Sequence, residues 1–287
     1  MHSSGNGEPA AVFVPGGGSF GLDFLLVHEQ VAKLTTSVLY DRAGTGWSDD
    51  ADLPRSADEV TDELRTLLQV ADVPAPYLLI GHSLGGVYVQ RFAQRFPGEV
   101  AGLLLLDPAH EDWDIYQPEH LRLAANRSAE IKPPEVSDEI LGQVRASFDA
   151  MFGGFPPAIR KQLIDKRLTT ERLLTGFQEG GKLLDDLEDL RNGGVRPDVP
   201  LIVLSGTDVD PSQMMFQPEE LIREQIRGSE RLFDAIAAAA PRGRHRTLQD
   251  ASHPTLPMAR PDAVATAVSD LLAEINVTAN HSGASGC

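Results

Sequence analysis

The sequence predicts an α/β fold, with a doubly wound, mostly parallel sheet covered by helices on both faces. Short apolar runs, each ended by turn residues, occur at 11–14, 37–40, 77–80 and 103–106. Continuous apolar runs of this kind are typical of strands buried on both faces. The sheet pattern resumes at 200–205 and at 245–248. Helical patterns separate the runs, and this alternation predicts parallel strands joined by helices.

Three segments have the spacing of amphipathic helices. In 57–70, apolar residues recur every three or four positions and therefore share one helix face. A second helix is predicted at 87–96, where Pro97-Gly98 ends it, and a third at 262–275. These helices would cover the sheet formed by the apolar runs.

Residues 110–196 lack a strand pattern and are rich in charged amphipathic segments. Helices are expected there at 118–131, 137–152, 157–168 and 170–190. The simplest division of the chain is an α/β core at 1–109 and 197–276, interrupted by an all-helical lid at 110–196. A flexible tail is expected at 277–287, where small and polar residues dominate.

The composition excludes several classes of partner. The formal net charge is −17, which argues against nucleic acid and anionic membrane surfaces because both require a basic face. Cys287 is the single cysteine, so neither an internal disulfide nor a thiolate metal cluster is possible. The apolar runs are far too short to span a membrane, and the first ten residues lack the features of a signal peptide. We therefore expect a soluble, cytoplasmic protein.

Residues 81–85, GHSLG, match the pattern G-x-S-x-G between a strand and a helix. This is the context in which a nucleophile elbow exposes its serine at the carboxyl end of a strand. The turn strains the backbone of Ser83 and places the N–H of Leu84 at the N-terminus of the helix, where it can face an oxyanion. Ser83 is therefore the candidate nucleophile. The alternative is that Ser83 only caps the helix.

Five segments together resemble the α/β-hydrolase superfamily. They are PGGG (15–18), YDRAGTGWSD (40–49), GHSLGG (81–86), LLLLDPAH (103–110) and ASHPTLPMARPDAV (251–264). The resemblance covers 11–110 and 244–272, and implies an α/β-hydrolase fold and a Ser–acid–His hydrolase that needs no cofactor. The superfamily usually has two antiparallel strands before the run at 11–14. Only about ten polar residues precede that run here, so we expect this hairpin to be missing or rudimentary.

A serine hydroxyl becomes an effective nucleophile when a base takes its proton. His253 is the candidate base, because it lies in a turn before the last helix, where the resemblance places the superfamily's histidine. The acid that would orient His253 is open between three aspartates. We favour Asp107, at the end of the fourth apolar run, where some lipases, haloalkane dehalogenases and lactonases carry their acid. Asp208 and Asp210 are the alternatives, and they flank Val209 at the commoner position.

The oxyanion that forms during acyl transfer needs backbone N–H donors. The candidates are Leu84 and Gly17, and Pro15 replaces the histidine that the superfamily carries in this loop. A serine nucleophile argues against epoxide and haloalkane hydrolysis, which need a carboxylate. The expected substrate is a small hydrophobic carboxylic ester or lactone, cleaved through an acyl-enzyme.

Two other functions remain open at this point. Gly16, Gly18 and Gly21 spell G-x-G-x-x-G after a strand, and Asp41 follows 20 residues beyond Gly21, which is the spacing of a dinucleotide-binding oxidoreductase. That interpretation leaves Ser83 and its flanking glycines without a role. The other possibility is a non-catalytic module that binds a ligand at a hydrolase-like site.

Overall fold

The computed structural model describes residues 1–123, 138–211, 213–215 and 217–284. Its centre is a seven-stranded sheet in the order β1–β3–β2–β4–β5–β6–β7, parallel in every described pair except β1–β3. The strands are β1 (His2–Ser4), β2 (Ala11–Val14), β3 (Ser37–Leu39), β4 (Tyr77–His82), β5 (Val100–Leu106), β6 (Leu201–Gly206) and β7 (Gly243–Leu248). The predicted α/β class with a mostly parallel sheet is confirmed.

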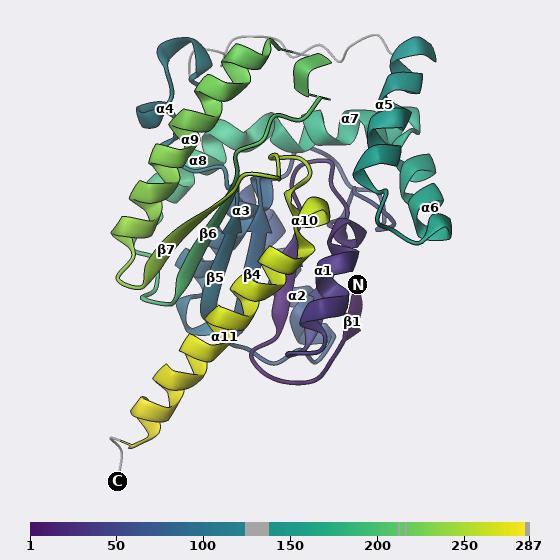
Figure 1. Ribbon diagram of the computed structural model, residues 1–287. Helices are drawn as coiled ribbons and strands as arrows, with labels where there is room; N and C mark the ends of the chain where they lie inside the picture. Colours follow the sequence, from purple (N-terminus) through teal and green to yellow (C-terminus); the bar gives the residue numbers. More distant parts are fainter. Residues whose placement is uncertain (124–137, 212, 216, 285–287) are drawn as a thin grey trace.

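Helices lie on both sides of the sheet (Figure 1). One side carries α2 (Ala57–Val70), α3 (Leu84–Arg95), α8 (Leu183–Asn192) and α9 (Glu219–Ala239). The other side carries α1 (Leu25–Val31), α10 (Leu256–Ala259) and α11 (Pro261–Ala284). The sheet is therefore buried on both faces, as its continuous apolar strands require.

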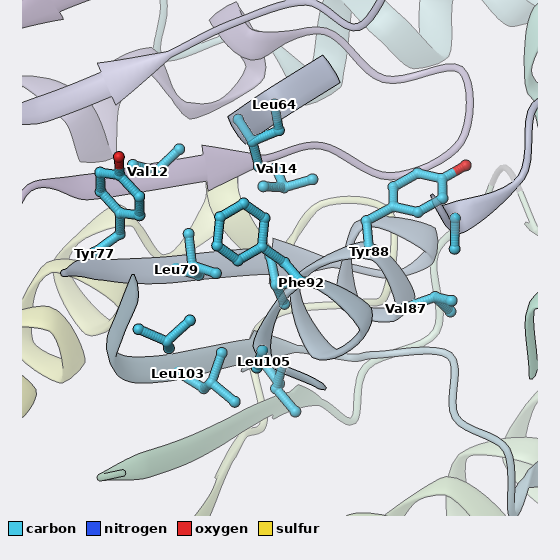
Figure 2. Close-up of a cluster of buried hydrophobic side chains, with 14 of the residues drawn as sticks. Val12, Val14, Leu64, Tyr77, Leu79, Val87, Tyr88, Phe92, Leu103 and Leu105 are labelled. Atoms are coloured by element: carbon cyan, nitrogen blue, oxygen red, sulfur yellow. The ribbon is translucent and has the colours of Figure 1, made fainter. Parts of the chain in front are cut away.

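Alternate residues of the central strands enter opposite hydrophobic cores. In β4, Tyr77 and Leu79 belong to the core under α3, whereas Leu78 and Ile80 belong to the core under α11. Figure 2 shows the first of these cores, in which the Phe92 ring of α3 lies among side chains from β2, β4 and β5. This period of two follows from the pleat of a strand and fixes which face each residue occupies.

The N-terminal strand is short. β1 spans three residues and pairs antiparallel with β3 at the edge of the sheet, with His2 opposite Leu39. A single strand thus stands before β2, in agreement with the expected rudimentary hairpin.

Several helix boundaries differ from the sequence predictions. The helix predicted at 87–96 begins earlier, at Leu84, and the single helix predicted at 170–190 is divided at Gly180 into α7 (Thr170–Glu179) and α8. Of the helix predicted at 118–131, the described part forms only a short 3-10 turn at 119–121, and the remainder from 124 lies outside the described residues. A short helix that was not predicted, α4 (Trp113–Tyr116), precedes this turn. The 21-residue α9 has no counterpart among the predicted helices.

The last helix also runs further than predicted. α11 continues through residues 277–284, where a flexible tail was expected. After Asn276 no proline or glycine precedes Gly283, so nothing in the local sequence stops the helix before that point. Residues 285–287 lie outside the described residues. Within the described ranges, no helix combines the length and the apolar character needed to cross a membrane.

The topology brings two loops together at one end of the sheet. β2 lies between β3 and β4, so the chain builds β3 on one side of β2 and then crosses to add β4 on the other. The loops that follow β2 and β4 open a crevice at this switch point, the usual ligand site of such sheets. α5 (Asp138–Met151), α6 (Pro157–Arg167) and α7 lie beyond the same end of the sheet (Figure 1).

Candidate active site

Ser83 occupies a sharp turn between β4 and α3. Its backbone has φ 52° and ψ −118°, a conformation that residues with a side chain rarely adopt. The turn is possible because glycines flank it. A Cβ added to Gly81 would lie 2.5 Å from the carbonyl oxygen of Gly85, and a Cβ added to Gly85 would clash with the carbonyl oxygen of Val14. The sequence GHSLG therefore folds into the strained elbow that its pattern predicts.

His253 meets Ser83 from the far end of the sequence. Its Nε2 lies 3.1 Å from the Ser83 Oγ, although 170 residues separate the two. His82 stabilises the turn that carries His253, because its Nε2–H donates a 2.9 Å hydrogen bond to the His253 carbonyl oxygen. The predicted nucleophile and base are thus within hydrogen-bond distance of each other.

Both histidines are uncharged near neutral pH. Desolvation lowers the pKa of His253 to about 4, although part of its side chain remains exposed. Desolvation, and secondly the neighbouring His253, lowers the pKa of His82 to about 3. A neutral imidazole with its proton on Nδ1 can accept the Ser83 hydroxyl proton at Nε2, as a general base must.

The structure places the three candidate acids differently. Asp107 is buried at the end of β5, with φ 41°, and its Oδ2 accepts a 3.0 Å hydrogen bond from the Gly206 N–H. Burial raises the pKa of Asp107 to about 7, and the bond from Gly206 opposes this rise. Asp208 is exposed, and its Oδ1 accepts a 2.8 Å bond from the N–H of its neighbour Val209.

The third candidate, Asp210, contacts the residue before the histidine. Its Oδ2 accepts a 3.3 Å hydrogen bond from the Ser252 Oγ. In the part of the chain that the structure describes, neither Asp107 nor Asp208 forms a hydrogen bond or ion pair with His253. The geometry therefore brings Ser83 and His253 together, and Asp107 and Asp208 line a cavity that both of them also line.

Two backbone N–H groups at the elbow, those of Gly17 and Leu84, are candidate oxyanion donors. Among the described residues, neither the N–H of Gly17 nor that of Leu84 has an intramolecular hydrogen-bond partner. The loop after β2 packs on the elbow, because a Cβ added to Gly16 would lie 3.2 Å from the Ser83 Cβ and one added to Gly17 would lie 3.4 Å from the Leu84 Cδ2. Unpaired donors at a helix N-terminus are suited to an oxyanion.

Comparison with known proteins identifies the family to which this arrangement belongs. The sequence profile described as the alpha/beta hydrolase family matches residues 11–267. The chain belongs to this family.

Relatives with curated sequences match the α/β hydrolase over shorter segments. It is 44% identical over 73 residues to an uncharacterized protein of Schizosaccharomyces pombe, a match covering 25% of this chain and 14% of that protein. The uncharacterized protein YqjL of Bacillus subtilis is 34% identical over 112 residues, or 39% of this chain and 44% of YqjL. The matches thus span less than half the length of these relatives.

Solved structures match the α/β hydrolase over nearly its whole length. A thermophilic esterase from Thermogutta terrifontis aligns with a TM-score of 0.61 and 19% identity, covering 96% of this chain and 92% of that chain. A putative epoxide hydrolase from Pseudomonas aeruginosa aligns with a TM-score of 0.66 and 19% identity, covering 96% and 91%. At this level of identity the similarity shows a shared fold.

Two cavities of the α/β hydrolase are lined by both Ser83 and His253. The first has a volume of about 180 Å³ and is lined by Asp107 and Asp208 as well. Apolar side chains from three helical regions complete much of its wall: Trp113, Leu183, Ile222, Ile226 and Phe233.

The second cavity has a volume of about 420 Å³ and lies against the loop 16–18. Its wall includes Phe148, Met151, Phe177 and Met258. Ser83 thus lies where two largely apolar chambers meet.

A Ser–His–Asp array that the sequence analysis missed is built on Ser205, which lines the smaller cavity. Nε2 of His245 lies 2.7 Å from the Ser205 Oγ, and its Nδ1 lies 2.8 Å from the Asp234 Oδ1. The two N–H groups that follow Ser205 are already bonded, that of Gly206 to Asp107 and that of Thr207 to the Leu248 carbonyl oxygen. Neither of these two groups is available to stabilise an oxyanion at Ser205, unlike the Gly17 and Leu84 N–H groups beside Ser83.

The glycine-rich loop has a structural use different from dinucleotide binding. Asp41 accepts a 2.7 Å hydrogen bond from the Gly21 N–H and a 2.9 Å bond from the Trp47 N–H, so its carboxylate is occupied within the fold. The family match gives the dinucleotide-binding alternative no support. In the described ranges, no cluster of three or more metal-ligating side chains could hold a metal ion.

Proposed function

We propose that the protein is a serine hydrolase that cleaves carboxylic esters or lactones of small hydrophobic molecules. The observation that carries the proposal is the 3.1 Å separation of the Ser83 Oγ and the His253 Nε2 at a strained elbow. The family membership supports hydrolase activity in general. The ester or lactone class is inferred from the serine nucleophile and from the apolar walls of the two cavities.

The proposed reaction proceeds through an acyl-enzyme. The Ser83 Oγ attacks the carbonyl carbon while Nε2 of His253 takes its proton. The N–H groups of Gly17 and Leu84 hold the negative charge that develops on the carbonyl oxygen. His253 then gives the proton to the departing alkoxide. Water, deprotonated by the same imidazole, releases the acid and restores the serine.

Asp107 is the acid that we assign to this reaction. A carboxylate that orients the imidazole is usually buried and fixed by hydrogen bonds, and Asp107 has both properties, whereas Asp208 is exposed. Asp107 also lines the cavity that contains Ser83 and His253. Rotation of its free oxygen toward Nδ1 of His253 would complete the triad.

The nucleophile separates this function from that of an epoxide hydrolase. Among the solved structures that share the fold are chains described as epoxide hydrolases. Epoxide opening through an ester intermediate needs a carboxylate nucleophile, and this chain has Ser83 at the elbow. We therefore expect hydrolysis of carbonyl substrates rather than epoxides.

A fluorophosphonate probe and a series of nitrophenyl esters test the proposal. The probe should label Ser83, as mapped by mass spectrometry, and Ser83→Ala should remove both the label and ester turnover. Ser205→Ala is the matched control, because Ser205 is also bonded to a histidine and lines the same cavity, yet its variant should still be labelled at Ser83. Absence of labelling in the wild type would favour a ligand-binding module. Turnover of the acetate ester alone would contradict the hydrophobic substrate class.

A further inference from the structure

Arg42, which follows β3, is fully buried beside the loop after β2. Its side chain is 1% exposed and donates hydrogen bonds to two carbonyl oxygens of that loop, Pro15 at 2.6 Å and Gly16 at 2.7 Å. The same guanidinium forms two hydrogen bonds to the carboxylate of Glu179, at 2.8 Å and 3.0 Å. Arg42 thus bonds to the core loop and to the helical insertion at once.

Glu179 is the last residue of α7, and its carboxylate bonds both to Arg42 and to the loop after β2. Its side chain is 4% exposed, and its Oε2 accepts a 2.7 Å hydrogen bond from the Gly18 N–H. The carbonyl groups of residues 15 and 16 and the N–H of residue 18 are therefore all bonded to one ion pair. Gly17 lies between them, with its own N–H left available for a ligand.

Separating Arg42 from Glu179 would cost considerable free energy. Parallel hydrogen bonds between a guanidinium and a carboxylate are strong and fix the orientation of both groups. Burial alone would lower the pKa of Arg42, but the charge of Glu179 and the bonds to it outweigh this effect and raise the pKa. Removing one partner leaves an uncompensated charge in the interior.

We propose that Arg42 and Glu179 are positioning residues that couple the seating of α7 to the shape of the oxyanion-binding loop. When α7 is seated, Glu179 bonds to Gly18 and Arg42, and the Gly17 N–H is presented beside the Leu84 N–H. When α7 is displaced, the loop loses these bonds and the donor is no longer fixed. This inference rests on the proposed hydrolase function for its catalytic consequence, and on the hydrogen-bond pattern alone for its structural one.

The variant Glu179→Gln tests the coupling, because it retains the size of the side chain and removes its charge. Asp186→Asn is the matched control. Asp186 is also a buried carboxylate of the insertion, and its Oδ1 accepts a 2.7 Å hydrogen bond from the core Ala57 N–H, away from the loop 15–18. Oxyanion donors act mainly in the transition state, so Glu179→Gln should lower kcat by about tenfold or more with KM changed by less than about threefold. Asp186→Asn should leave kcat unchanged.

Hydrogen exchange supplies a readout that does not depend on hydrolysis. Amides of residues 16–20 should exchange at least about fivefold faster in Glu179→Gln than in the wild type, and at the wild-type rate in Asp186→Asn. If Glu179→Gln does not fold, Arg42→Lys provides the same test, since a lysine keeps the charge but cannot bond all four oxygens. Unchanged exchange in the folded variant would overturn the coupling. Faster exchange in a protein that hydrolyses no ester would retain the coupling and reject the hydrolase assignment.

Discussion

The N–H of Gly206 donates a 3.0 Å hydrogen bond to Oδ2 of Asp107 and so connects the ends of β6 and β5. The bond fixes one oxygen of a buried carboxylate and leaves the residue facing the cavity that Ser83 and His253 share. Burial raises the pKa of this carboxylate to about 7.

Replacement of the acid should separate the candidate aspartates. Asp107→Asn should lower kcat by about 10³-fold or more, because an amide cannot stabilise the imidazolium that forms on His253. Asp208→Asn should keep kcat within about threefold of the wild type, since the Asp208 side chain is exposed and bonded to its own neighbour. Steady-state kinetics with one nitrophenyl ester measures both. The reverse order of effects would assign the acid to Asp208.

The pH dependence of turnover should follow the ionisation of Asp107. An acid with a pKa of about 7 loses its charge as the pH falls below that value, so kcat/KM should fall about tenfold per pH unit below pH 7. His253, with its pKa lowered to about 4, would by itself limit activity only in more acidic solution. Asp107→Asn should therefore lack an inflection near pH 7 in its residual activity. An inflection that persists there in this variant would have to belong to another group.

The same pKa predicts that Asp107 destabilises the fold at alkaline pH. Its folded-state pKa of about 7 exceeds the ordinary value of 3.8, so between these values the native state holds a proton that the unfolded state has released. The free energy of unfolding should fall as the pH rises through this window, by up to about 4 kcal/mol. Asp107→Asn removes this cost and still offers an acceptor to the Gly206 N–H. Urea unfolding at pH 5 and pH 8 measures this effect. The free energy of unfolding of Asp107→Asn should exceed that of the wild type by more at pH 8 than at pH 5. An equal difference at both pH values would contradict the assignment.

His82 should affect turnover through the loop that it holds. Its Nε2–H bonds the His253 carbonyl oxygen, so His82→Ala frees the turn that carries the base. A shift of the base by about 1 Å can cost about 10²-fold in rate, and we expect kcat to fall by about ten- to a hundredfold. His82→Gln, which keeps an N–H donor of similar reach, should recover part of the loss. Equal activity of all three proteins would show that the hydrogen bond is dispensable.

The sheet could be predicted from the sequence because its strands are unambiguous. The runs at 11–14, 77–80 and 103–106 are apolar without interruption and end in turn residues, so burial on both faces is visible from composition alone. The elbow at Ser83 is equally local, since its two flanking glycines are what the strained turn requires.

Other features depend on contacts between distant residues. The pair Arg42 and Glu179 is 137 residues apart in sequence, and no local pattern connects them. α9 does have an amphipathic pattern, with Ile222, Phe233 and Ile236 buried along it, and could have been predicted by the same spacing that identified α2. The sequence favoured Asp107 only by its position, because Asp107 and Asp208 lie at neighbouring strand ends and the direction of each carboxyl group depends on contacts between distant residues.

The two chambers that meet at Ser83 differ more than twofold in volume, about 180 Å³ against about 420 Å³. In the proposed reaction, a fixed Ser83 Oγ and fixed oxyanion donors would present only one prochiral side of a carbonyl to attack. The substituents at a stereocentre next to the carbonyl would then occupy different cavities, the smaller one and the larger one. One mirror-image form of a racemic substrate should fit this division and the other should not, so the fold itself provides a basis for enantioselectivity.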